Sequence, residues 1–177
     1  MYIQDQVRWT ELDDEILDFY RAIGVDCVHL ELRSGVARAD ESLAADLRAG
    51  IDCTDRFAQA RERIESHGLR LNNVFLSCWP EIPLGQPEAD DRIDAWCRML
   101  ESLGRAGIPY LGWNFKPMGN FRTTSDTGRG GVRYSTFDYN EFMANRPPLY
   151  QPPVSEADML VRMERFLKAV IPVAAKA

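Results

Sequence analysis

The stretch LDFYRAIGVDCVHLEL (17–32) decides the predicted fold, because it passes from helical spacing to a strand at a single glycine. The glycine suits the left-handed position just past a helix end, and apolar residues of strand type follow at once. The same order recurs in ARERIESHGLRLNNVFL (60–76) and WCRMLESLGRAGIPYLGW (96–113). The junction glycines are Gly24, Gly68 and Gly107. We therefore predict a chain of repeated helix-to-strand units.

Two flanking segments extend this order. A leading strand is expected near residues 2–7, and a last helix roughly over residues 155–175, with Pro172 kinking or ending it. The expected buried stripe of this last helix consists of Met159, Leu160, Met163, Phe166, Leu167 and Val170. The chain then reads as four strand–helix units.

Strand–helix alternation predicts a parallel sheet, which leaves a doubly wound sheet or a (β/α)8 barrel. The sequence has no GxGxxG after the first strand, which weakens a dinucleotide-binding interpretation. Segments rich in polar side chains follow the second, third and fourth strands, and the active sites of barrel enzymes form in the loops after the strands. A complete barrel needs eight units and typically ~250 residues. We therefore predict an α/β fold of the TIM-barrel type, in which residues 1–177 form a single partial domain, a half-barrel of about four units.

Composition and charge narrow the function classes. The net charge of −6 argues against nucleic-acid binding, which needs a basic face. No stretch approaches the ~18 consecutive apolar residues of a membrane span, and the N-terminus lacks the pattern of a signal peptide. The four cysteines form no CxxC pair, so we expect reduced thiols in a cytoplasmic protein. From the charge and the lack of an apolar span, we expect a protein that binds neither nucleic acid nor membrane.

Side chains of the second strand, CVHLELR (27–33), should alternate between two faces. His29 and Glu31 would then point inward near the carboxyl end of the strand, together with Cys27 and Arg33. There they could touch a polar substrate, with His29 as the binding candidate. The alternative is an interior histidine that is hydrogen-bonded to a neighbouring acid. His67, at a helix end, is expected to be structural.

The segment 115–154 is the strongest functional signal. It has little periodicity, and loops longer than ~12–15 residues are usually functional or disordered. Its many aromatic residues argue against disorder. Its arginines, whose planar forks suit a carboxylate, are Arg122, Arg129 and Arg133. The GRGG run predicts a sharp turn or a close backbone approach. The alternative is a surface flap whose arginines pair with Asp126 and Asp138.

At this point the residues resemble a known family. The segment GIPYLGWNFKPMGNFRTTSDTGRGGVRYSTFD (107–138), with IPLGQPEADDRIDAWCRMLESLGRAGIP (82–109) before it, resembles the mannonate dehydratases. The shared pattern is an aromatic-Asn-Phe strand end, then Pro, Arg-Thr, Gly-Arg-Gly-Gly and Phe-Asp. The resemblance implies a metal-dependent barrel related to xylose-isomerase-like sugar enzymes. The implied activity is a lyase reaction in hexuronate catabolism, the dehydration of D-mannonate to 2-keto-3-deoxy-D-gluconate.

The resemblance also implies roles for residues of the long loop. Arg122 and Arg133 would hold the carboxylate or hydroxyls of the sugar acid. Trp113 and Asn114, at the end of the fourth strand, would line the pocket, and Tyr134 would offer a polar contact. With His29, these form the expected substrate-binding set. No general base is assigned, and Asn73, Ser77 and Trp79 near the third strand's end are a weak signal.

The resemblance places the metal, Mn²⁺ or Fe²⁺, on His, Cys and Asp residues of later strands that this chain lacks. We therefore expect no tight metal site in the chain and no activity from the chain alone. Lys116 also stands where family members more often have Met. Two alternatives stay open: a sugar isomerase or epimerase of the same barrel class, and a non-catalytic remnant that binds a sugar acid or a partner. Open sheet edges predict a homo-oligomer or complementation by the missing half.

Overall fold

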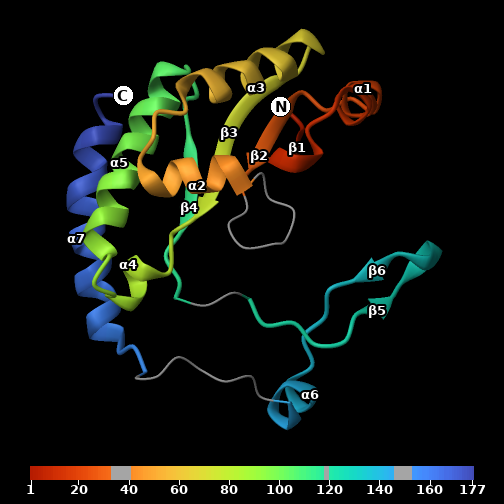
Figure 1. Ribbon diagram of the computed structural model, residues 1–177. Coiled ribbons are helices and arrows are strands. Elements are labelled where there is room, and N and C mark those ends of the chain that lie inside the picture. The colour runs from red at the N-terminus through yellow and green to blue at the C-terminus, as the bar shows by residue number, and fades with distance from the viewer. Residues whose placement is uncertain (33–40, 118–119, 146–152) are drawn as a thin grey trace.

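The structure is a computed structural model that describes residues 1–32, 41–117, 120–145 and 153–177, so Arg33 lies outside the described residues. Its main sheet has four parallel strands in the order β1-β2-β3-β4 (Figure 1). They span Gln4–Arg8, Cys27–Glu31, Arg70–Ser77 and Leu111–Asn114. The predicted parallel sheet of consecutive strands is confirmed.

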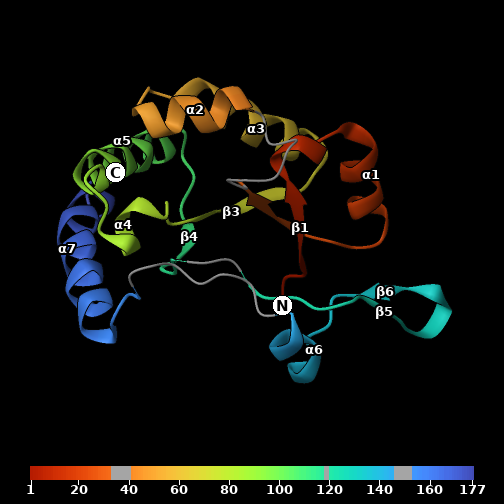
Figure 2. The ribbon, with the colours of Figure 1, turned by 60° about the horizontal axis from the view of Figure 1, so that its bottom comes forward.

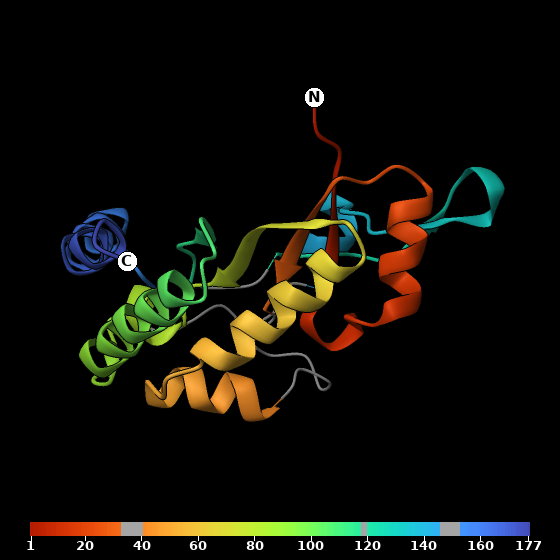
Figure 3. The ribbon, with the colours of Figure 1, turned by 90° about the horizontal axis from the view of Figure 1, so that it is seen from above.

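Helices cover one side of this sheet. In Figure 2, α7, α5, α2, α3 and α1 form an arc outside the strands, and the view from above shows the same layer (Figure 3). The helices are α1 (Asp14–Ala22), α2 (Glu41–Ala49), α3 (Thr54–Ser66), α4 (Glu81–Leu84), α5 (Ala89–Arg105), α6 (Tyr139–Ala144) and α7 (Glu156–Ala174). Short 3-10 turns occupy η1 (Trp9–Glu11) and η2 (Arg129–Gly131). The arc leaves the opposite, concave face of the sheet to the loops.

Local sequence explains where these helices begin and end. The side chain of Asp13 accepts a hydrogen bond from Ile16 N at the start of α1, and Ser155 does the same from Asp158 N at the start of α7. The junction glycines Gly24, Gly68 and Gly107 have φ of 89°, 73° and 72°, which confirms the predicted left-handed helix ends. Each turn feeds the chain directly into the next strand.

The core lies between the sheet and the helices. Val28, Leu30 and Leu32 are buried on the helix side, as predicted from their alternation. An aromatic cluster joins the sheet to α5 and α7: the rings of Trp96 and Phe166 lie 5.4 Å apart, centre to centre. Because both rings are almost fully buried, this cluster anchors α7 to the rest of the domain.

The predicted buried stripe of α7 is only partly confirmed. Phe166 and Val170 are buried, whereas Met159, Met163 and Leu167 are half-buried and Leu160 is exposed. The physical reason is that α5 and β4 cover one side of the helix, and the stripe is wider than that side. Pro172 does not end α7, which runs on to Ala174. A proline lacks the N–H that would bond to the carbonyl four residues back, and only Val173 and Ala174 of the helix follow Pro172.

The described residues between β4 and α7, 115–117 and 120–145, lie beyond the carboxyl ends of the strands (Figure 1). They include α6 and a small antiparallel hairpin of β5 (Asp126–Thr127) and β6 (Arg133–Tyr134). Gly130 and Gly131 have φ of 73° and 80°, which confirms the sharp turn predicted from GRGG. Among the helices that the structure describes, none combines the length and apolarity that crossing a membrane requires.

Candidate functional site

The concave face of the sheet is polar. On β2, His29 and Glu31 are half-buried on this face, as the predicted alternation requires. On β3, Asn73, Phe75 and Ser77, two residues apart, are also half-buried. Side chains two apart on a strand share a face, so these residues form adjoining rows. The rows lead toward the carboxyl ends of the strands, where the long loop begins.

Hydrogen bonds link these rows across neighbouring strands. Gln6 Nε2 on β1 donates to Glu31 Oε2 over 2.5 Å. The side-chain amide of Asn73 lies within hydrogen-bond distance of the imidazole of His29, with 2.8 Å between Asn73 Nδ2 and His29 Nδ1. The His29 ring also packs on Phe75, with centroids 5.7 Å apart. His29 is thus bonded to the amide of Asn73. Among the described residues, no carboxylate contacts its ring, as the alternative of pairing with a neighbouring acid would require.

β4 completes the face with a small residue and an amide. Asn114 Nδ2 donates to Ser77 Oγ over 3.3 Å. A Cβ at Gly112 would lie 2.9 Å from Phe75 Cδ2, so the glycine makes room for that ring. The amide of Asn114 therefore reaches the end of the polar row through Ser77.

A pocket of about 370 Å³ opens where the sheet meets the loop, within the usual size range of small-molecule sites. It is lined by Glu31, Leu32, Phe75, Ser77, Asn120, Arg122 and Ser135. Arg122 Nη1 donates to the carbonyl of Phe121 over 2.8 Å, and no ion pair holds its guanidinium among the described residues. One pocket thus combines an arginine, a carboxylate and two hydroxyls.

The structure brings some of the expected substrate-binding residues together and separates others. Arg122 lines the pocket, Asn114 contacts its rim through Ser77, and His29 lies on the same face. Arg133 and Tyr134 lie instead on the hairpin. Arg133 Nη2 donates to Ser125 Oγ over 2.7 Å, and the Tyr134 ring lies against Gly128. Neither of these two residues lines the pocket.

Trp113 lies on the other side of the sheet. Its ring packs 5.3 Å from that of Phe166 on α7 and 6.3 Å from that of Phe115. Strand alternation explains this, since Trp113 and Asn114 are neighbours in sequence and must point to opposite faces. A role for Trp113 in substrate binding stays a prediction, and its observed contacts are those of a core residue.

Several pocket residues lie outside the expected binding set. The sequence places Glu31 on the inward face, where it could touch a polar substrate, but leaves it out of the expected binding set, and Ser77 gives only a weak signal. The period of two through residues 73, 75 and 77 would have found the β3 contribution. Asn120 and Ser135 carry no comparable sequence signal, because loop geometry brings them to the pocket, and neither does Gln6, which strand register places behind Glu31.

The described residues offer no cluster of ligands for a divalent metal. In the described ranges, no three His, Cys, Asp or Glu side chains gather where they could hold one ion. Cys78, next to the pocket residue Ser77, is not a candidate thiolate, since burial raises the pKa of its thiol to about 12. No step of the chemistry below is therefore assigned to a metal.

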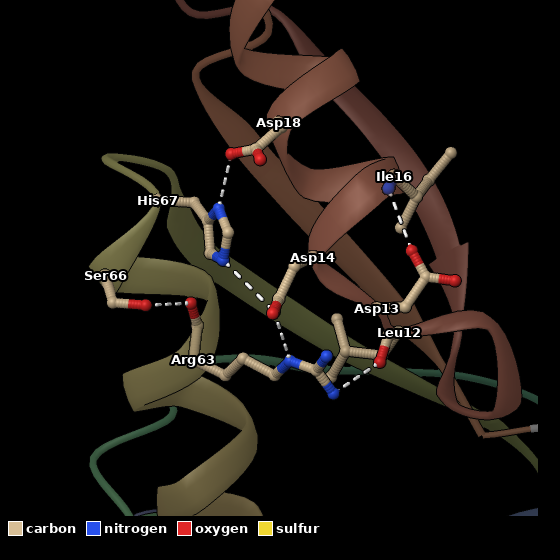
Figure 4. Close-up of polar contacts among 8 residues, drawn as sticks. All are labelled: Leu12, Asp13, Asp14, Ile16, Asp18, Arg63, Ser66 and His67. Atoms are coloured by element: carbon tan, nitrogen blue, oxygen red, sulfur yellow. Dashed lines mark hydrogen bonds and ion pairs between the residues drawn. The ribbon is translucent and has the colours of Figure 1, made fainter.

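His67 belongs to a separate cluster that joins α1 to α3 (Figure 4). Its Nδ1 lies 2.7 Å from Asp18 Oδ1 and its Nε2 lies 3.3 Å from Asp14 Oδ1, while Arg63 Nε donates to Asp14 over 2.9 Å. Hydrogen bonding to Asp18, supported by Asp14, raises the pKa of His67. The cluster precedes β3, at the end of the sheet opposite the pocket, in agreement with the expected structural role.

Comparison with known proteins supports the resemblance, although no family model matches the chain. A mannonate dehydratase of Streptococcus pneumoniae (strain 70585) is 25% identical over 150 residues, which cover 70% of this chain and 41% of that protein. A crystal structure of mannonate dehydratase from Streptococcus suis serotype 2 matches with a TM-score of 0.80 and 20% identity, over 99% of this chain and 51% of that one. The chain thus spans about half the length of these relatives. Sequence and fold together confirm the resemblance to mannonate dehydratases.

Proposed function

We propose that this chain forms the sugar-acid-binding half of a mannonate dehydratase-like lyase, which converts D-mannonate to 2-keto-3-deoxy-D-gluconate. The similarity to mannonate dehydratases in sequence and in fold supports this reaction class. The observation that carries the proposal is the pocket itself. Arg122 from the long loop and Glu31 from β2 line one hollow at the carboxyl ends of the strands. Active sites of barrel enzymes form at that end.

The pocket matches the chemistry of a sugar acid, which has one carboxylate and a row of hydroxyls. The guanidinium of Arg122 offers a planar fork to the carboxylate. Glu31, oriented by Gln6, accepts hydrogen bonds from substrate hydroxyls. The hydroxyl of Ser77 can donate or accept beside them. A neutral sugar would leave Arg122 without its counter-charge, so the pocket selects the acid.

The same contacts serve the dehydration. A base removes the proton from the carbon next to the carboxylate, and the hydroxyl of the following carbon leaves as water. The resulting enol becomes the 2-keto group. Negative charge grows on the carboxylate as the proton leaves, and Arg122 stabilises that charge. The Mn²⁺ or Fe²⁺ that the resemblance implies stays a prediction, because the described residues form no site for it.

A sugar isomerase or epimerase would use a similar pocket but would release no water. Both compared proteins are mannonate dehydratases, which favours the lyase. Recovery of a keto-deoxy acid, as opposed to an isomerised sugar, separates the two reactions. We further propose that the protein works in the cytoplasm, since all four cysteines are free thiols.

Isothermal titration calorimetry tests the binding proposal. The full chain should bind D-mannonate, and it should bind D-mannitol, which has the hydroxyls but no carboxylate, at least tenfold more weakly. A charge-assisted hydrogen bond is worth about 1.5–3 kcal/mol, which predicts a tenfold to hundredfold difference. Equal affinity for both compounds, or no binding of D-mannonate, would overturn the proposal.

A further inference from the structure

The first turn of α6 shows only half of the usual capping arrangement. The side chain of Asp138, the N-cap residue, accepts a hydrogen bond from Glu141 N over 2.8 Å. In a capping box, an acidic side chain at the position of Glu141 would reach back to the backbone N–H of the N-cap residue. Here that N–H donates instead to Thr123 Oγ1 over 2.9 Å. The carboxylate of Glu141 is therefore left for another contact.

Glu141 uses this carboxylate on the same stretch of the long loop. The backbone N–H and the hydroxyl of Thr124 both donate to Glu141 Oε1, over 2.9 Å and 2.6 Å. Because Glu141 is half-buried, salt and water screen these bonds less than they would on an open surface. Bonds to a charged acceptor are the stronger kind, and these two fix both the backbone and the side chain of Thr124.

Thr136 holds the same two residues from the other side. Thr123 N donates to the carbonyl of Thr136 over 3.0 Å, and the hydroxyl of Thr136 donates to the carbonyl of Thr124. Both backbone N–H groups of residues 123 and 124 are thus bonded. The name α6 clamp is used below for the contacts of Thr123 and Thr124 with Thr136, Asp138 and Glu141.

The α6 clamp lies directly beside Arg122, which lines the pocket. Thr123 follows Arg122 in the chain, and Phe121 precedes it. The ring of Phe121 packs on that of Phe142 in α6, with centroids 4.9 Å apart. The chain is therefore tied to α6 on both sides of Arg122. The guanidinium bonds to the carbonyl of Phe121, its own neighbour, so its place at the pocket depends on the backbone that carries it.

We propose that Glu141 is a positioning residue for sugar-acid binding. It fixes the backbone that carries Arg122 and so holds the guanidinium at the pocket before the ligand arrives. This inference rests on the proposed function, in which Arg122 binds the carboxylate. A side chain that is placed in advance loses less conformational freedom on binding, which strengthens the complex. Glu141 does not line the pocket, and its negative charge by itself disfavours an anion. Its effect through position and its effect through charge therefore have opposite signs.

Calorimetry with D-mannonate separates the two effects. Glu141→Ala should weaken binding by about threefold to tenfold, the usual cost of ordering one mobile side chain, whereas loss of the charge alone would strengthen it. Glu141→Gln should keep most of the affinity, because its amide oxygen still accepts from Thr124. Asp126→Ala is the matched control. It removes a carboxylate of the same loop that bonds to Thr127 N and lies outside the α6 clamp, so it should not weaken binding.

A double-mutant cycle tests whether Glu141 acts through Arg122. In a chain that already carries Arg122→Ala, Glu141→Ala should cost little further affinity, since the side chain that it positions is gone. Losses that add up in the double variant would overturn the proposal, and so would full affinity in Glu141→Ala. If the unaltered chain does not bind D-mannonate, this proposal and the proposed function both fail; unchanged affinity in Glu141→Ala overturns this proposal alone.

Amide hydrogen exchange tests the α6 clamp without ligand. The N–H of Thr124 should exchange faster in Glu141→Ala and should stay protected in Glu141→Gln. Circular dichroism checks that both variants keep the helices of the domain. Unchanged exchange at Thr124 in the alanine variant, or equal loss of affinity in the alanine and glutamine variants, would also overturn the proposal.

Discussion

Gln6 and Glu31 are joined by a 2.5 Å hydrogen bond between Gln6 Nε2 on β1 and Glu31 Oε2 on β2. The bond links the first strand to the pocket, which Gln6 itself does not line. It orients the carboxylate of Glu31 in the pocket that Arg122 also lines. Because Gln6 acts through Glu31, it is a positioning residue.

Replacing Gln6 should therefore weaken sugar-acid binding, although Gln6 itself does not contact the ligand. We expect Gln6→Leu to lower the affinity for D-mannonate about fivefold, or about 1 kcal/mol, because Glu31 loses the bond that orients it but keeps its own contact to the ligand. Gln4→Leu is the control, since Gln4 lies on the same strand as Gln6 and accepts a hydrogen bond from Asn72 on β3, but does not line the pocket. Calorimetry of both variants measures this. An equal loss in the two would show a general effect on β1.

The structure separates two arginines that the sequence grouped together. Arg122→Ala should lower the affinity for D-mannonate tenfold to hundredfold, since a contact to a charged group is worth about 1.5–3 kcal/mol. Arg133→Ala should change it little, because Arg133 bonds to Ser125 on the hairpin. Neither change should alter the thermal midpoint by much. A similar loss of affinity in both variants would show that Arg133 also contributes to ligand binding.

His67 should make stability depend on pH. Its pKa is raised in the folded chain, chiefly by Asp18, above the unfolded value of about 6.5. The stabilisation is therefore complete below about pH 6.5 and is lost as the pH rises through the folded pKa. His67→Gln should abolish this dependence. Urea unfolding of both proteins between pH 5 and about 9 measures it, and parallel curves for the two would contradict the assignment.

Phe166 should be the costliest aromatic residue to truncate. It is fully buried between Trp96, Trp113 and Phe115. Phe166→Ala should destabilise the chain by about 3–5 kcal/mol, the usual cost of a buried Phe-to-Ala change. Phe137→Ala is the control, since Phe137 is exposed on the loop and contacts Phe142. Urea midpoints would show whether only the first change is severe.

The sequence predicted the framework because its signals are local. A glycine at each helix-to-strand junction and the alternation through Val28 and Leu30 are set by neighbouring residues alone. Local signals could not show which residues of the apolar stripe on α7 are buried. Leu160 has the right spacing to be buried, yet burial depends on whether another element packs there.

The site was harder to predict than the fold, for two physical reasons. Alternation would have separated Trp113 from Asn114, but the motif grouped them because they are adjacent in sequence. Gln6 and Ser135 reach the pocket region through strand register and loop path, which local patterns do not encode. Arg122 could be found because a planar cation in a long loop is itself a chemical signal.

The most direct test of the central claim is a two-dimensional NMR titration of the full chain with D-mannonate. The sugar-acid site predicts saturable shifts of the backbone amides around Glu31, Ser77 and Arg122, the residues that line one pocket. The amides of the β5–β6 hairpin, including Arg133, should move much less. Shifts centred on the hairpin, or no saturable shift at millimolar ligand, would contradict the assignment of this pocket to a sugar acid.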